Sequence, residues 1–328
     1  MSCYSAALEP EREETVKLLS FATETGPRVG ARLDDGVVDL TQALRETHPT
    51  MRESGSLLAI IQAGIDIDSI GAASIAQLRA ANRLDACRVA APRYLPPVLR
   101  PSKILALALN YQEHINEANL SFYNEPIVFE KYPSNMIGHG DEIELPPFPQ
   151  KVDEEHELAL VVGRVCRHIR PSEAPDYIFG YTICNDVSAR DRQGERLKMG
   201  QPYSYAKNFA TFCPIGPWVV TRAELPDARN LDMEVRVNGE TRRKGNSRDM
   251  IFDPYEVLAY CSDYTTMEPG DVISLGTFAG NKRIVAGDEV ALIIDRIGTL
   301  TNRVVAAKAP WRNFAEGVAT GPAVRHKS

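Results

Sequence analysis

An uncharged apolar run preceded by two carboxylates constrains the fold of this chain more than any other feature. The run Leu158–Val162 consists of apolar residues, two of them β-branched, and predicts a buried strand. Glu155 and Glu157 come directly before it. Because strand side chains alternate between faces, the two carboxylates should point the same way and His156 the opposite way. A hard divalent cation would relieve their repulsion, whereas the alternative is a strand with a solvated acidic edge.

The first third of the 328-residue chain differs in pattern from the rest. Short alternating runs separated by Gly and Asp turns over residues 17–40 predict a small β-meander, and apolar residues recur at helical spacing over residues 41–85. Four prolines between Pro92 and Pro101 predict a stiff linker. We therefore expect a small N-terminal α+β accessory domain over residues 1–95 and a main, catalytic domain over residues 96–328.

Strand signals dominate the main domain. They cover Ile104–Leu109, Ile127–Glu130, Leu158–Val162, Ile178–Asn185, Trp218–Thr221, Met233–Val237, Val272–Leu275 and Val290–Ile294. The dipeptide Asn238-Gly239 is typical of a hairpin turn, and Pro254–Tyr260 is the clearest helix. Many short strands with few helices favour an α+β, mostly β fold over a doubly wound parallel sheet.

The composition of the chain narrows the classes of molecule that it could bind. The net charge of −7 and the isoelectric point near 5.5 argue against nucleic acid or an anionic membrane as a partner. No apolar run approaches the roughly 20 residues of a membrane helix, and the acidic, polar first fourteen residues do not resemble a signal peptide. The six cysteines are scattered, which is typical of reduced thiols. We expect a cytoplasmic protein. No dinucleotide or phosphate-binding loop and no G-x-S-x-G elbow is present.

Further candidate residues follow the strand signals, each with a plainer alternative. Asp186 ends the strand that begins at residue 178, either as a ligand or as a turn or helix-capping carboxylate. His114 and Glu117 are spaced i and i+3, either as an oriented base or as a solvated helix face. Lys207 is an ordinary exposed lysine by default, and Thr277 ends a strand.

Read jointly, these segments resemble the fumarylacetoacetate hydrolase family, and specifically its longer members with an N-terminal accessory domain. The ordered motifs are N-Y-x-x-H-x-x-E over residues 110–117, F-x-K-x-P-S over 129–134, E-x-E-L-A-x-V-V-G over 155–163, G-Y-T-x-x-N-D-V-S-A-R-D-x-Q over 180–193, K-x-F-x-T-F-C-P-I-G-P over 207–217, V-N-G over 237–239 and E-P-G-D-V-I-x-x-G-T over 268–277. Ala210 departs from the pattern, because the family commonly has Asp there.

The resemblance implies a specific site. One Mg²⁺ or Mn²⁺ per subunit would be held by the carboxylates Glu155, Glu157 and Asp186, and would receive a 2-oxo acid substrate. Lys207 and Gln193 match substrate-contacting positions, and Thr277 matches the position that binds the substrate carboxylate. His114 and Glu117 match a dyad that activates water. The implied fold is a mixed β-roll, usually in a homodimer.

The leading functional hypothesis is a metal-dependent hydrolase that cleaves a C–C bond in an acylpyruvate or related β-diketo acid. The same chemistry also serves an oxaloacetate-type decarboxylase, a tautomerase or isomerase, and a hydratase or dehydratase of 2-oxo acids. A more distant alternative is a non-catalytic paralogue that binds a small acid.

Overall fold

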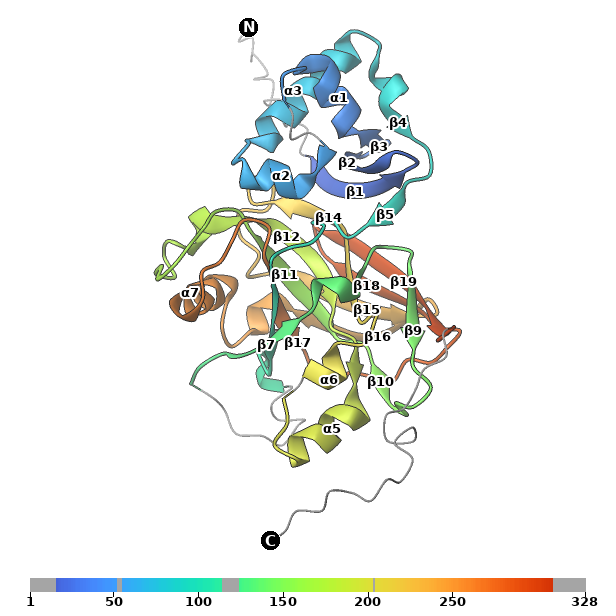
Figure 1. Ribbon diagram of the computed structural model, residues 1–328, viewed down its shortest axis with the longest axis vertical. Coiled ribbons are helices and arrows are strands. Elements are labelled where there is room, and N and C mark those ends of the chain that lie inside the picture. The colour runs from blue at the N-terminus through green and yellow to red at the C-terminus, as the bar shows by residue number, and fades with distance from the viewer. Residues whose placement is uncertain (1–15, 52–54, 114–123, 203, 309–328) are drawn as a thin grey trace, which may run out of the picture.

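The computed structural model describes residues 16–51, 55–113, 124–202 and 204–308 (Figure 1). The helices α1–α3 lie at one end of the molecule, whereas α5 and α6 lie at the opposite end. Strands fill the space between them, and α7 packs at the side. The α+β, mostly β class predicted from the sequence is therefore confirmed.

The N-terminal region folds as the predicted meander followed by helices. Its elements are β1 (Lys17–Thr23), β2 (Gly26–Leu33), β3 (Gly36–Asp39), α1 (Leu40–Thr47), α2 (Leu57–Gln62), α3 (Ile67–Ala80) and β4 (Arg88–Val89). Each helix begins at a residue whose side chain accepts a backbone N–H: Asp39 for α1, Ser56 for α2 and Asp66 for α3. Leu18, Leu44, Ile60 and Ile75 belong to the apolar core of this region.

The N-terminal strands join the sheet of the rest of the chain. β1 pairs with β14 (Cys213–Thr221) at Leu18 and Val219, and β5 (Arg93–Leu95) pairs with β1 inside the proline-rich segment. Hydrogen bonding thus crosses the boundary expected near residue 95. The division into two domains stays a prediction.

Two sheets form the main region. The larger continues from β14 through strands in the order β12 (Ile178–Asn185), β11 (His156–Val162), β17 (Val272–Thr277), β6 (Ile104–Ala108) and β7 (Ile127–Lys131), with β8 (Met136–Ile137) beside β14. The second has the order β16 (Glu240–Asn246), β15 (Asp232–Val237), β18 (Glu289–Ile294), β19 (Gly298–Ala306) and β9 (Glu142–Leu145). β10 (Val152–Asp153) and β13 (Ser188–Ala189) form a separate pair. The larger sheet is mixed, because β17 and β6 run parallel while β11 pairs antiparallel with both its neighbours.

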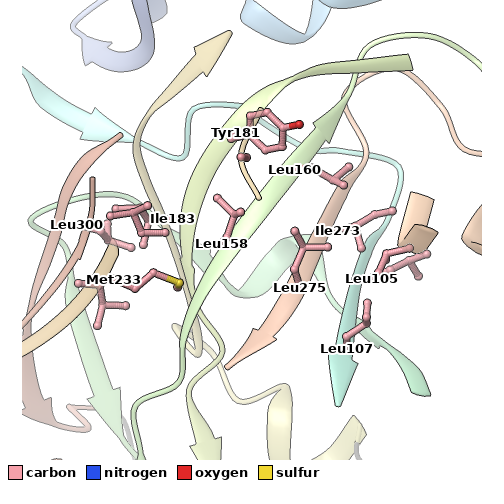
Figure 2. Close-up of a cluster of buried hydrophobic side chains, with 14 of the residues drawn as sticks. Leu105, Leu107, Leu158, Leu160, Tyr181, Ile183, Met233, Ile273, Leu275 and Leu300 are labelled. Atoms are coloured by element: carbon pink, nitrogen blue, oxygen red, sulfur yellow. The ribbon is translucent and has the colours of Figure 1, made fainter. Parts of the chain in front are cut away.

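The main apolar core lies on one face of β11. Leu158 and Leu160 point into it, together with Ile183 of β12 and Leu275 of β17 (Figure 2). Met233 of the second sheet belongs to the same cluster. Ala159 belongs to a different cluster, so the faces of β11 alternate as the sequence predicts. The two sheets therefore enclose the core between them.

Helices and turns complete the described elements. They are α5 (Arg190–Lys198), α6 (Ser204–Lys207), α7 (Pro254–Tyr264) and the 3₁₀ turns η2 (Leu84–Cys87), η3 (Pro133–Asn135), η4 (Ala174–Tyr177) and η5 (Ser247–Asp249). A capping box between Asp253 and Glu256 begins α7, which extends beyond the predicted end at Tyr260. Sequence reasoning missed β9 and β19. None of the helices in the described ranges is long and apolar enough to cross a membrane.

Candidate metal centre and active site

Three buried carboxylates converge at one end of the larger sheet. Glu155 directly precedes β11, Glu157 is its second residue, and Asp186 directly follows β12. Because His156 of β11 lies opposite Asn185 of β12, the antiparallel pairing brings the start of one strand to the end of the other. Oxygen atoms of the three carboxylates lie within 4.8 Å of one another. The side-by-side strands thus assemble, in space, a triad that is dispersed in the sequence.

Glu157 is held by one of its two oxygens. Its Oε2 accepts hydrogen bonds from Ser274 Oγ at 2.6 Å and from the backbone N–H of Gly276 at 3.0 Å. Gly276 has a φ of +85°, and a Cβ there would lie 2.8 Å from Asn110 Cβ, so this turn requires glycine. Among the described residues, Glu157 Oε1 has no hydrogen-bond partner. One oxygen of Glu157 therefore remains to bind a ligand.

The charges of the triad fit a hard divalent cation. Burial, with Asp186 and Glu155 alongside, raises the pKa of the Glu157 carboxyl well above its usual range. Burial is the larger cause of this shift, and the two neighbouring carboxylates add to it because they disfavour a third negative charge beside them. Carboxylate oxygens are the ligands that Mg²⁺ and Mn²⁺ prefer, and the three grouped residues are all carboxylates. The donor set and the unpaired oxygen of Glu157 thus fit the expected ion.

A buried lysine bridges two of the carboxylates. Lys207, the last residue of α6, places Nζ 2.6 Å from Glu155 Oε2 and also donates to Asp186. Burial opposes the charged form of Lys207, but Asp186 and Glu155 outweigh it and raise the pKa of the lysine. The side chain is only 4% exposed, so the default reading of Lys207 as a surface residue is wrong.

Sequence reasoning missed a second buried lysine. Lys131, in β7, donates from Nζ to Asp186 Oδ1 at 2.5 Å and to the carbonyl oxygen of Lys207 at 2.7 Å. It fixes one oxygen of Asp186 and leaves the other facing Lys207. The sequence places Lys131 two residues after Phe129 and therefore on the same face of a strand, but the burial of Lys131 is a tertiary property.

Arg190 was also missed, and it connects Gln193 to the triad. Its guanidinium donates to Glu155 Oε1 from Nη2, to Asp153 Oδ2 at 3.1 Å from Nε, and to Gln193 Oε1 at 2.9 Å from Nη1. Asn281 Nδ2 approaches Glu155 Oε1 at 3.2 Å. Arg190 therefore links the predicted substrate contact Gln193 to the predicted metal ligand Glu155.

Thr277 lies beside the triad, whereas His156 faces away from it. Thr277 is the last residue of β17 and is paired with Glu157 across the sheet. The His156 ring packs edge-on against Phe278 at 5.9 Å between centroids. Burial, helped by Arg243, holds the pKa of His156 well below its usual range, so this imidazole is neutral. The alternation expected around His156 is confirmed.

The predicted dyad His114 and Glu117 lies outside the described residues. Its role as the activator of water therefore rests on the sequence. The assignments of Glu155, Glu157, Asp186, Lys207, Gln193 and Thr277 to metal or substrate likewise stay predictions, although the structure brings these six side chains into one region.

Comparison with known proteins identifies the family of this chain. Residues 103–305 match the family described as fumarylacetoacetate (FAA) hydrolase, C-terminal. The human mitochondrial oxaloacetate tautomerase FAHD2A is 41% identical over 219 residues, which are 65% of this chain and 69% of that protein.

Two solved structures resemble nearly the whole chain. A fumarylacetoacetate hydrolase from the psychrophile Exiguobacterium antarcticum is 31% identical, with a TM-score of 0.73 over 89% of this chain and 100% of that one. A maleylpyruvate hydrolase from Sphingobium sp. SYK-6, solved with manganese(II) and pyruvate, is 30% identical, with a TM-score of 0.70 and the same coverage.

Proposed function

This chain belongs to the fumarylacetoacetate hydrolase family, and from that premise we propose that it is a divalent-metal-dependent enzyme that interconverts the keto and enol forms of a 2-oxo acid such as oxaloacetate. The observation that carries the proposal is the buried triad with Lys207 Nζ lying 2.6 Å from Glu155 Oε2. The identity of 41% to a tautomerase supports the choice of reaction.

The site suits the charge that develops during enolisation. Glu155, Glu157 and Asp186 would hold Mg²⁺ or Mn²⁺, which when bound would polarise the 2-oxo group of the substrate. Lys207 keeps its proton because its pKa is raised, so it acts by charge on the oxygen that becomes negative. Preorganised positive groups in a dry site stabilise such charge better than water does.

The remaining described residues orient the acid. Thr277 would bind its carboxylate, and Gln193, held by Arg190, would also contact the substrate. The buried setting limits access of water, because the side chains of Lys207 and Asp186 are no more than 4% exposed and Glu157 is buried. Tautomerisation moves one proton between C3 and the 2-oxygen, and it needs no attacking water.

Hydrolysis of a C–C bond in an acylpyruvate is the second candidate. The segment N-Y-x-x-H-x-x-E over residues 110–117 favours it, as does the likeness to a maleylpyruvate hydrolase. In that reaction His114, held by Glu117, would take a proton from the attacking water. A homodimer and a cytoplasmic location stay predictions under either reaction.

One experiment separates the two reactions. The enol of oxaloacetate, followed by its ultraviolet absorbance with Mg²⁺ or Mn²⁺, reports tautomerisation, and loss of an acylpyruvate reports hydrolysis. We expect the wild-type protein to accelerate enol–keto exchange and the Glu157→Gln protein to lose that activity. Wild-type protein that cleaves acylpyruvates but leaves the enol of oxaloacetate unchanged would reverse the order of the two candidates.

The His114→Ala variant sharpens the choice. A general base is typically worth about 10² to 10⁴ in rate, so hydrolysis should fall by that order while Mn²⁺ affinity remains nearly intact. The matched control is Glu113→Ala, an exposed residue one position away, which should leave both rates within about twofold. Hydrolysis that survives in His114→Ala at the wild-type rate rules out this base.

A further inference from the structure

A second buried charge pair lies behind Thr277. Arg243, in β16, places Nη2 2.7 Å from Glu154 Oε2 and Nε 3.2 Å from Glu154 Oε1, which is a two-pronged contact. Arg243 is 8% exposed and Glu154 is fully buried. A buried ion pair contributes little net stability compared with apolar residues of the same size, so stability alone gives no reason for it.

The same guanidinium holds the end of β17. Its Nη1 and Nη2 each lie 3.2 Å from Thr277 Oγ1, and Nη1 donates to the carbonyl oxygen of Phe278 at 2.5 Å. Its Cζ stacks 4.3 Å from the centre of the Phe278 ring. Arg243 therefore fixes both the hydroxyl of Thr277 and the backbone that follows it.

These contacts determine the direction of the Thr277 hydrogen bond. A threonine hydroxyl has one proton to donate and two lone pairs that accept, whereas a guanidinium only donates. The two N–H groups of Arg243 take up the lone pairs, which leaves the single O–H to donate elsewhere. The neighbouring positive charge also makes that O–H a stronger donor. A hydroxyl arranged in this way suits an anionic acceptor.

We propose that Arg243, oriented by Glu154, is a positioning residue that makes Thr277 an obligate hydrogen-bond donor to the carboxylate of the bound 2-oxo acid. The inference rests on the proposed function only in taking a 2-oxo acid as the ligand. Glu154 holds the planar guanidinium in place and balances its charge. The carboxylate of the substrate therefore accepts a hydrogen bond from the hydroxyl of Thr277 and does not pair directly with Arg243.

The test uses a double variant that removes both charges, because removing one member of a buried pair leaves the other charge unpaired and can prevent folding. Arg243→Gln with Glu154→Gln keeps two hydrogen-bonding side chains and removes both charges. Pyruvate is titrated calorimetrically into the Mn²⁺-loaded full-length protein, and Mn²⁺ affinity is measured separately. We expect pyruvate affinity to fall about tenfold, the size of one charge-assisted hydrogen bond, and Mn²⁺ affinity to change less than about twofold.

Thr277 variants show whether Arg243 acts through the hydroxyl. Thr277→Val should lose a similar factor of about ten, Thr277→Ser should keep the affinity, and the triple variant with Thr277→Val should lose little more than Thr277→Val alone. The matched control is Arg236→Gln, an exposed arginine of the neighbouring strand β15, which should bind pyruvate as the wild type does.

Four outcomes overturn the inference, and the first three concern pyruvate alone. These three are wild-type protein that does not bind pyruvate, a double variant that binds it unchanged, and losses that multiply in the triple variant as independent effects do. An equal fall of Mn²⁺ and pyruvate affinity would show a structural role and also overturn it. Failure of the proposed function is a separate result, since a protein that binds pyruvate but turns over no oxaloacetate leaves these binding measurements intact.

Discussion

The N-terminal region and the strands around β11 use charged side chains in opposite ways. Among the described residues of 16–95, Asp39 is the one buried charged side chain, and it caps α1 and pairs with Arg28, a near neighbour in sequence. Around β11, by contrast, buried charges meet across long stretches of chain: Lys207 with Glu155, Lys131 with Asp186, and Arg243 with Glu154.

The difference shows where this protein tolerates an energetic cost. Burying a charge is unfavourable to folding even when the charge is paired. An exposed ion pair, in contrast, changes the free energy of unfolding little. A cluster of buried charges is therefore poor evidence for stability, and its concentration at one end of one sheet indicates a functional site. The same contrast orders the expected effects of substitution.

The largest effect is expected at Glu157. Glu157→Gln removes one charge from the triad and should lower Mg²⁺ affinity at least about a hundredfold, which calorimetric titration measures. The chain should still fold, because the buried carboxyl already favours its neutral form and glutamine has the same shape. The control Asp35→Asn, at an exposed carboxylate of the N-terminal region, should leave Mg²⁺ binding unchanged. Unchanged affinity in Glu157→Gln would refute the triad.

Lys207 follows. Lys207→Met removes the charge beside Glu155 and Asp186 and should lower kcat for enolisation about 10² to 10³-fold, comparable to the loss of one preorganised donor. Mg²⁺ affinity should not weaken, since the ammonium competes for the same oxygens. Ala210→Asp, at an exposed position three residues away, should alter the rate less than about threefold. A kcat within twofold of wild type in Lys207→Met would end this assignment.

A pH dependence of stability comes next in size. The folded protein binds an extra proton at Glu157, because the pKa of this carboxyl is raised above its unfolded value near ~4.3. Metal-free protein should therefore become less stable as pH rises from that unfolded value toward the folded one. Saturating Mg²⁺ should remove the loss, since the cation binds the deprotonated form. Thermal unfolding between about pH 5 and 8 measures both, and Glu157→Gln should flatten the metal-free curve.

The smallest effect is expected in the N-terminal region. Arg88 and Asp35 form an ion pair whose side chains are 27% and 57% exposed. Arg88→Gln should lower the free energy of unfolding by no more than about 1 kcal/mol and leave turnover unchanged. Denaturant unfolding supplies the measurement. A loss above about 2 kcal/mol would show that the contrast between the two regions is not one of exposed against buried charge.

Much of this architecture is determined locally and was predicted from the sequence. The alternation that separates Glu157 from Leu158, the helix that begins at Pro254 and the hairpin at Asn238 each depend on neighbours within a few residues. The strand β9 escaped prediction because its parallel pairing with β19 joins segments far apart in the chain. The strand β19 also forms a local hairpin with β18, which sequence reasoning overlooked.

The candidate site likewise has features that are determined locally and features that depend on long-range packing. The sequence by itself determined that the carboxylates Glu155, Glu157 and Asp186 stand at strand ends, because strand ends and spacing are local properties. Only the tertiary structure decided what lies against them. Whether a lysine or arginine is solvated or buried depends on the segments that pack over it, so the contacts of Lys131 with Asp186 and of Arg243 with Glu154 could be seen only in the tertiary structure.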